Sequence, residues 1–204
     1  MANIASPRPR ILDLLVWSAL AVPAVAWVAT ASAMAAEDLE DLLLPSGELS
    51  ARFLIVALAI TPLALLLPDN RFIKWLRRQR RAIGLAAFGY GVLHLIFYLV
   101  AMGTFDAVLA ELGATGIWSG WLALALLVPL ALTSSSAAMR ALGRNWKRVQ
   151  RLAYPAALLT LAHWLTIHDG FIVALAHFAP LVILELIRIP SAHPRRRHSL
   201  KDRQ

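Results

Sequence analysis

The sequence predicts an all-α membrane protein, a single bundle of six transmembrane helices with both termini in the cytoplasm. Hydrophobic residues make up 59% of the 204 residues, and the mean hydropathy is +0.65. The apolar residues gather in six long runs, and the basic residues gather between alternate runs. This composition leaves too little polar surface for a soluble globule, so we expect residues 1–204 to form one transmembrane domain.

The six apolar runs predict the six membrane helices, because about 20 apolar residues in a helix cross the hydrocarbon core of a bilayer. The runs cover residues 11–36, 49–67, 82–102, 117–133, 152–167 and 171–189. The first run follows Arg8 and Arg10 and ends among small residues, a pattern that cleavable signal peptides share. Its length favours a first helix that is not cleaved.

The charged residues predict the orientation of the bundle. With the amino terminus in the cytoplasm, 19 of the 20 Lys and Arg residues fall on the cytoplasmic face, as the positive-inside rule requires. Most acidic residues then fall on the opposite face, and residues 191–204 form a basic cytoplasmic tail. The net charge of +8 needs no nucleic-acid partner on this interpretation, and membrane lipid is the default partner of the basic loops.

The chain contains no cysteine. Disulfides, cysteine-ligated iron–sulfur clusters and the covalent attachment of a c-type haem are therefore excluded. Any haem in this protein has to be bound non-covalently and ligated by histidine.

Two histidines lie at matching depths in the predicted membrane helices. His94 follows Arg81 by 13 residues, and His163 follows Arg151 by 12 residues. At a rise of ~1.5 Å per residue, both imidazoles lie ~18 to 20 Å above the basic boundary, on two parallel helices. Because a histidine in hydrocarbon is costly without a partner or a function, the pair predicts the axial ligands of a b-type haem. The alternative is that they only form hydrogen bonds between helices.

Two further residues are candidates for the same site. His177, in the sixth apolar run, could reach the depth of His94 and is a rival axial ligand. Arg52 is the one cation outside the predicted basic face. A guanidinium there could bind a haem propionate by charge-assisted hydrogen bonds, or it could simply extend to the membrane interface.

Two segments resemble a known family. Residues 80–94, which end at His94, and residues 132–154, which lead to His163, resemble the haem-binding membrane subunits of protein-methionine-sulfoxide reductase systems, the MsrQ or YedZ family. This family lies within the ferric-reductase-like transmembrane superfamily. Ser46-Gly47, residues 51–54 and Thr61-Pro62-Leu63 are similar to the family's second helix, so the resemblance covers a haem-binding core of about residues 45–170.

The resemblance implies a six-helix b-type cytochrome that serves a periplasmic molybdopterin-containing reductase, which reduces oxidised methionine in envelope proteins. His94 and His163 match the family's haem histidines. Gln150 stands where the family pattern has a histidine, and glutamine is a poor ligand for haem iron, so one haem is expected and a second is doubtful. The resemblance also makes FMN a candidate cofactor.

We therefore expect an electron-transfer subunit in a bacterial inner membrane, a part of an oxidoreductase complex without catalytic residues of its own. Electrons would come from a quinol or a cytoplasmic flavin reductase and go to the periplasmic reductase. One alternative is a stand-alone ferric-reductase-like enzyme that reduces metal chelates directly. A second, from a different class, is a small transporter or scaffold without haem, in which the two histidines serve proton coupling or packing.

Overall fold

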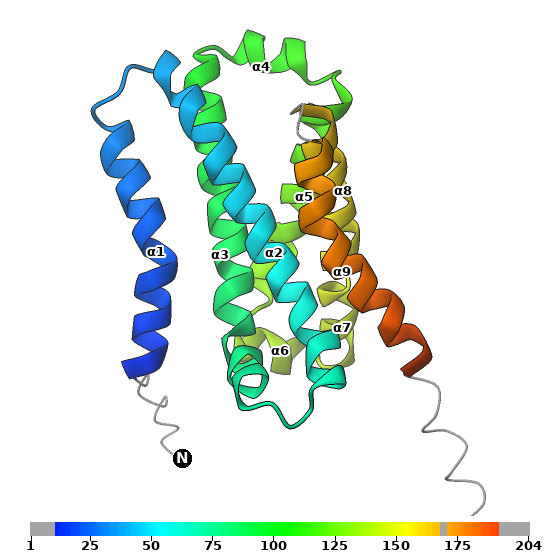
Figure 1. Ribbon diagram of the computed structural model, residues 1–204. Coiled ribbons are helices and arrows are strands. Elements are labelled where there is room, and N and C mark those ends of the chain that lie inside the picture. The colour runs from blue at the N-terminus through cyan, green and yellow to red at the C-terminus, as the bar shows by residue number, and fades with distance from the viewer. Residues whose placement is uncertain (1–10, 168–170, 192–204) are drawn as a thin grey trace, which may run out of the picture.

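In the computed structural model, the described residues, 11–167 and 171–191, form helices joined by short turns (Figure 1). The elements are α1 (Ile11–Ala31), the 3₁₀ helix η1 (Glu37–Leu42), α2 (Leu43–Leu66), α3 (Arg71–Met102), α4 (Phe105–Glu111), α5 (Thr115–Leu132), α6 (Ser136–Leu142), α7 (Arg144–Gln150), α8 (Ala153–Ile167) and α9 (Phe171–Ser191). The predicted all-α class is confirmed for these residues. Arg8, Arg10 and nearly all of the predicted basic tail, residues 192–204, lie outside the described part of the chain.

Five segments of the described chain are long and apolar enough to cross a membrane, so the protein is a multi-pass membrane protein. They are α1, residues 38–66, α3, α5 and α9. The predicted run 152–167 corresponds to α8, whose 15 residues give a length of ~22 Å. The helix therefore falls short of a typical span, and the count of six membrane helices stays a prediction.

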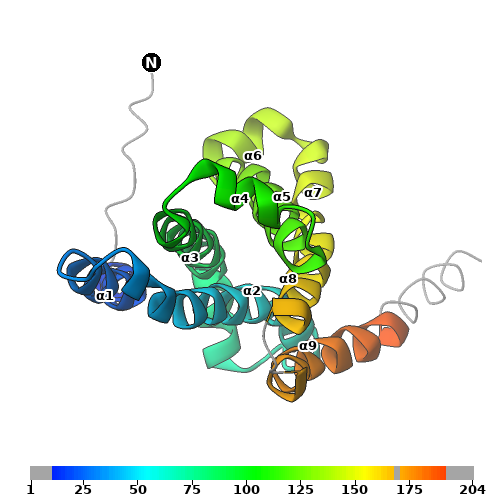
Figure 2. The same ribbon diagram turned by 90° about the horizontal axis from the view of Figure 1, so that it is seen from above.

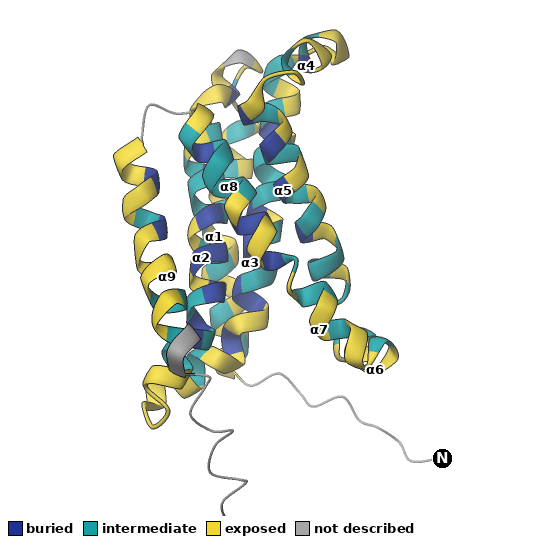
Figure 3. Ribbon diagram, turned by 90° about the vertical axis from the view of Figure 1, so that its right-hand side faces the viewer, coloured by how far each residue is buried: buried dark blue, intermediate teal, exposed yellow. Residues whose placement is uncertain are grey.

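Four helices, α2, α3, α5 and α8, surround the centre of the bundle, with α1 and α9 at its periphery (Figure 2). The main buried cluster joins α2, α5, α8 and α9 with Ala87 of α3. Alanines such as Ala51, Ala156 and Ala174 occupy many of its positions, and small side chains allow membrane helices to approach closely. Buried residues concentrate on the sides of α2, α3, α5 and α8 that face one another, whereas α6 and α7 are mostly exposed (Figure 3).

Opposite charges lie at opposite ends of the bundle. The basic start of α3 and the basic helices α6 and α7 lie at one end, where the described chain also begins (Figure 1). The acidic 3₁₀ helix η1 and α4, with Asp106 and Glu111, lie at the other end. This separation agrees with the charge pattern from which the orientation was predicted.

Several predicted boundaries were wrong, because they followed the ends of the apolar runs and a helix can extend into polar sequence. α3 begins eleven residues before the predicted run, since the side chain of Asn70 accepts hydrogen bonds from the amides of Phe72 and Ile73 at 2.9 and 3.1 Å. α2 begins at Leu43 rather than at residue 49, so Pro45-Ser46-Gly47 lies inside the helix. Consequently both helices extend further than their apolar runs.

Tyr90 of α3 fastens α1 to the bundle. Its hydroxyl donates to the carbonyl of Leu20 at 2.7 Å and accepts from the amide of Ala24 at 3.1 Å. These two groups would otherwise pair within α1, next to Pro23, which has no amide hydrogen. The ring of Tyr90 also packs against Trp27 of α1 with the ring centroids 5.7 Å apart. Since none of the residues of α1 is buried, this contact is a principal tie between α1 and the core.

Removing the hydroxyl in Tyr90→Phe should loosen α1, at a cost of about 1 kcal/mol in the free energy of unfolding, because both hydrogen bonds to its backbone are lost. The chain has no native cysteine, so spin labels at Val25→Cys in α1 and Ile96→Cys in α3 can report the distance between the helices. We expect a broader distance distribution in Tyr90→Phe. Tyr98→Phe is the control, because the Tyr98 hydroxyl bonds Glu111 rather than α1; equal distributions in all three proteins would contradict the prediction.

Candidate functional site: a pair of facing histidines

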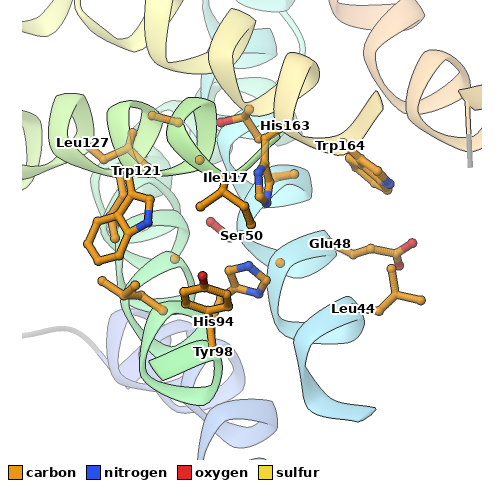
Figure 4. Close-up of a pocket in the computed structure, with 18 residues that line it drawn as sticks. Leu44, Glu48, Ser50, His94, Tyr98, Ile117, Trp121, Leu127, His163 and Trp164 are labelled. Atoms are coloured by element: carbon orange, nitrogen blue, oxygen red, sulfur yellow. The ribbon is translucent and has the colours of Figure 1, made fainter. Parts of the chain in front are cut away.

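His94 of α3 and His163 of α8 point toward each other at the centre of the four-helix core (Figure 4). Their ring centroids are 6.0 Å apart and the ring planes are inclined by 82°. Both helices run away from the basic end of the bundle (Figure 1). The structure thus brings together the two histidines that were predicted to lie at one level from their distances, in residues, after Arg81 and Arg151.

The His94 ring rests on the neighbouring helix α2. Its Nδ1 lies 2.9 Å from the carbonyl oxygen of Leu43 and 3.3 Å from the hydroxyl oxygen of Ser46. The Ser46 hydroxyl itself donates to the carbonyls of Leu42 and Leu43 at 2.6 and 3.0 Å. The His94 ring is therefore fixed from one side by α2.

The His163 ring rests on α5 in a corresponding way. Its Nδ1 lies 2.7 Å from the carbonyl oxygen of Gly116. The hydroxyl of Ser119 donates to the same carbonyl at 2.8 Å. Each histidine is thus held by the backbone of the helix that packs against its own.

A glycine makes room for each ring. A Cβ atom at Gly47 would lie 3.1 Å from Nδ1 and Cε1 of His94, and one at Gly120 would lie 2.7 and 2.8 Å from the same two atoms of His163. Each glycine comes four residues after the residue whose carbonyl receives the ring. In an α-helix the carbonyl of residue i points toward residue i+4, so the missing Cβ opens a lateral approach to that carbonyl.

The hydrogen bonds fix the tautomer of both rings. A carbonyl oxygen can only accept, so Nδ1 of His94 and Nδ1 of His163 each carry the proton and donate it. The neutral imidazole then has its basic lone pair on Nε2. Metal-ligating histidines in proteins are oriented in this manner, by a hydrogen bond from the ring nitrogen that does not bind the metal.

A cavity opens beside the two rings, with about 890 Å³ of space including its open mouth. Residues of α2, α3, α5 and α8 line it, mostly apolar side chains such as Leu95, Ile117 and Trp121. Gly91 of α3 also lines the cavity. It allows α3 to pack closely here, because a Cβ at this position would lie 3.1 Å from Leu124 and 3.2 Å from Ser50. A largely apolar cavity with a few convergent polar groups is typical of cofactor sites.

The description of the family model that matches residues 46–161 is "Ferric reductase like transmembrane component". The chain belongs to this family. Three relatives are each named protein-methionine-sulfoxide reductase heme-binding subunit MsrQ. The Xanthomonas oryzae pv. oryzae (strain MAFF 311018) protein is 38% identical over 70% of this chain and 66% of its own length. The Rhizobium meliloti (strain 1021) protein is 40% identical over 64% and 58%, and the Rhodospirillum rubrum protein is 34% identical over 96% and 95%.

The predicted MsrQ resemblance is therefore confirmed at the level of the family. The chain matches just under two thirds of the length of the Xanthomonas relative, and nearly all of the Rhodospirillum relative. No solved structure matches the chain significantly. The segment that the ferric-reductase-like model matches, residues 46–161, contains His94 and both glycines that adjoin the rings. Leu42 of η1, Leu43 of α2 and His163 of α8 lie outside it.

The rival ligand His177 lies to one side of the paired rings. Its Nδ1 donates to the carbonyl of Val173 in its own helix at 2.8 Å, and its Nε2 accepts from Nε of Arg52 at 3.2 Å. The ring packs against Trp164, with centroids 5.2 Å apart. Both nitrogens of His177 are thereby engaged, and His177 is not among the residues that line the cavity, whereas His94 and His163 both line it.

Arg52 lies near the cavity and is half exposed. Its Nη2 forms an ion pair with Glu48 at 2.5 Å, and Glu48 is one of the cavity-lining residues. Exposed ion pairs of this kind contribute little to stability. The pair nevertheless keeps the guanidinium on the side of the bundle where α2 begins.

Gln150, at which a departure from the family pattern was expected, is the last residue of α7. Its amide nitrogen donates to the hydroxyl of Thr133 at 3.1 Å and to the carbonyl of Leu130 at 3.4 Å. Trp146 donates to the carbonyl of Thr133 at 2.9 Å. Gln150 therefore helps to attach α7 to the end of α5.

Sequence reasoning missed the residues that receive the histidine rings. Ser46 and Gly47 were read as a likeness to the family's second helix, and Ser119 and Gly120 were given no role. Backbone acceptors such as the carbonyls of Leu43 and Gly116 carry no side-chain signal. The repeated Ser-Gly pair near the same end of two membrane helices, Ser46-Gly47 and Ser119-Gly120, is the signal that could have revealed them.

Gly120→Ala should destabilise the protein, because the new methyl group would displace the His163 ring and break its hydrogen bond to Gly116. We expect a loss of about 1 to 3 kcal/mol in unfolding free energy, the cost of leaving a buried polar group unpaired. Gly89→Ala on α3 is the matched control, since a Cβ there has no atom within 4 Å and the helix gains about 0.5–1 kcal/mol. Thermal denaturation in detergent measures both; equal midpoints would contradict the role of Gly120.

Proposed function

We propose that this chain is the haem-binding subunit of a membrane electron-transfer system, and that His94 and His163 are the two axial ligands of one b-type haem. The observation that carries the proposal is the approach of the two imidazoles to 6.0 Å between centroids, with each Nδ1 anchored on a backbone carbonyl. The name of the MsrQ relatives, heme-binding subunit, supports the same assignment.

The geometry of the two rings fits a shared metal ion. His94 and His163 would hold the iron through Nε2, and a metal–imidazole bond of ~2 Å is compatible with the 6.0 Å between the ring centroids. The two neutral rings carry their lone pairs on Nε2, the nitrogen that a ligand needs. The absence of cysteine from the chain favours a non-covalent b-type haem over a c-type haem.

When bound, a haem supplies one-electron chemistry, and the protein supplies position and electrostatics. Leu43 and Gly116 orient the ligands through their carbonyls, and Gly47 and Gly120 leave room for the rings. Apolar residues of the cavity exclude water from the site. Arg52 is the proposed partner for a haem propionate, because its pairing with Glu48 keeps a guanidinium close to the cavity.

We assign one haem to the chain. The second site that the family pattern implies would need a ligand at Gln150, whose amide is engaged with Thr133 and Leu130. FMN stays a candidate cofactor from the family resemblance, and we assign no residues to it.

We further propose that α8 is the sixth membrane helix, that both termini are cytoplasmic, and that the membrane is the inner membrane of a bacterium. The separation of basic and acidic residues between the two ends supports this orientation. The cavity then lies in the half of the bundle toward the periplasm. The proposed donor is a quinol or a cytoplasmic flavin reductase, and the proposed acceptor is a periplasmic molybdopterin-containing methionine-sulfoxide reductase.

Detergent-purified protein should show the absorption bands of a b-type haem, which sharpen on reduction. His94→Ala and His163→Ala should each abolish or severely weaken the bands, because one ligand of the pair is removed. Gln150→Ala and His177→Ala should retain them, since both side chains are engaged elsewhere. Bands that persist in both histidine variants would overturn the assignment, and a colourless wild-type protein would favour the transporter or scaffold alternative.

Vesicles that contain the protein, a quinol and a periplasmic methionine-sulfoxide reductase should reduce methionine sulfoxide, and omission of the chain should abolish this activity. Replacement of the wild type by His94→Ala should lower the rate of sulfoxide reduction at least tenfold, because one of the two proposed haem ligands is lost. A ferric chelate serves as the comparison acceptor. Rapid reduction of the chelate without the reductase, and none of the sulfoxide with it, would favour the stand-alone ferric-reductase alternative.

A further inference from the structure

We propose that Ser119 is a positioning residue that raises the midpoint potential of the haem by sharing the carbonyl of Gly116 with the His163 ring. The inference rests on the proposed ligation of haem by His163. It concerns a different property, the potential rather than the binding of the haem.

The two sites that receive the histidine rings have the same arrangement of three residues on two different helices. In each, the carbonyl of residue i receives Nδ1 of a histidine, a serine at i+3 donates its hydroxyl to that carbonyl, and a glycine at i+4 opens the approach. On α2 the three residues are Leu43, Ser46 and Gly47; on α5 they are Gly116, Ser119 and Gly120. A serine in a helix often bonds the preceding turn, but in these two positions the bonded carbonyl is the one that anchors a histidine.

Both hydroxyls are buried, so water does not replace them. Ser46 is 0% exposed and Ser119 is 1% exposed. Hydrogen bonds are stronger in such low-dielectric surroundings, and neighbouring bonds polarise one another. A change in one donor to the shared carbonyl is therefore felt by the other.

On α5 the carbonyl oxygen of Gly116 receives two donors at nearly equal distance, Oγ of Ser119 at 2.8 Å and Nδ1 of His163 at 2.7 Å. A carbonyl has two lone pairs, and in a helix one is directed toward the amide of residue i+4. The hydroxyl and the imidazole consequently compete for the remaining electron density. Without the hydroxyl, the Nδ1–H bond of His163 would be donated more strongly.

The strength of that bond determines how electron-rich the ligand is. A stronger hydrogen bond from Nδ1–H increases the basicity of the imidazole, and a more electron-donating axial ligand stabilises ferric over ferrous haem. Ser119 weakens the bond, so it should favour the ferrous state and keep the potential higher than an alanine would.

Ser46 provides the weaker test of the same idea. Its hydroxyl donates to the carbonyl of Leu42 at 2.6 Å and at 3.0 Å to that of Leu43, which anchors His94. Its oxygen also lies 3.3 Å from Nδ1 of His94 and can accept from it. Removal of Ser46 would relieve the competition at Leu43 and also remove an acceptor from the ring. These two effects oppose each other, so Ser119 carries the larger expected change.

The experiment is a spectroelectrochemical titration of purified, haem-loaded Ser119→Ala beside the wild type. At a fixed ambient potential we expect the ferric-to-ferrous ratio to rise about threefold to tenfold, which corresponds to a fall of ~30 to 60 mV for a one-electron couple. Haem content per chain should be unchanged. Altered g-values of the ferric haem in electron paramagnetic resonance should accompany the shift, because they respond to the axial ligand.

Ser134→Ala is the matched control. The Ser134 hydroxyl, in the turn after α5, donates at 2.8 Å to the carbonyl of Ala131, three residues earlier, as Ser119 does to Gly116. Its carbonyl does not receive either of the paired histidines. The potential of Ser134→Ala should equal that of the wild type.

An unchanged or raised potential in Ser119→Ala with the haem retained would overturn the inference and leave the ligand assignment intact. A wild-type protein without haem would overturn the proposed function instead. If Ser119→Ala loses its haem, Ser119→Thr decides, because threonine keeps a hydroxyl that can bond the preceding turn. Haem bound at the wild-type potential in Ser119→Thr supports the inference, and a lost haem or a shifted potential contradicts it.

Discussion

The hydrogen bond from an imidazole Nδ1–H to the backbone carbonyl of a neighbouring helix is the interaction on which the arrangement of this protein depends. Each of these bonds depends on a glycine four residues after the carbonyl, Gly47 or Gly120, because a Cβ there would come too close to the ring. Each bond also requires the two helices to pack closely. The alanines of the core and the glycines of α2 and α5 meet that requirement. The close packing of the bundle and the orientation of its polar groups therefore have one cause.

This constraint separates the central helices from the peripheral ones. The residues that line the cavity come from α2, α3, α5 and α8. α9 contributes Ala174, Phe178 and Leu181 to the main buried cluster. α1 lies outside this cluster and is attached to α3 through the hydrogen bonds of Tyr90. The helices that hold the polar groups are also those with the most buried residues. In a membrane, where apolar side chains gain little by leaving lipid, packing and interhelical hydrogen bonds must hold such a core together.

The sequence predicted what apolar content and charge determine, namely the membrane segments and the shared depth of His94 and His163. The common depth follows from helical rise alone, and the facing of the rings could only be postulated. The backbone acceptors of the two histidines could not be predicted, because every residue has a carbonyl and the sequence does not mark that of Gly116. α2 passes through Pro45 because a proline in the first turn of a helix costs no amide hydrogen bond. The departure from the family pattern at Gln150 stays a prediction, and the attachment of this residue to Thr133 is visible only in three dimensions.

Each histidine is seated within its own pair of helices, His94 between α3 and α2, and His163 between α8 and α5. In a chain synthesised from its amino terminus, the earlier pair can be complete and correctly oriented while the later pair is still on the ribosome. The polar nitrogens are thus sheltered from lipid during insertion, each by a partner that emerges before it. Packing of the two pairs against each other brings the rings together and forms the cavity.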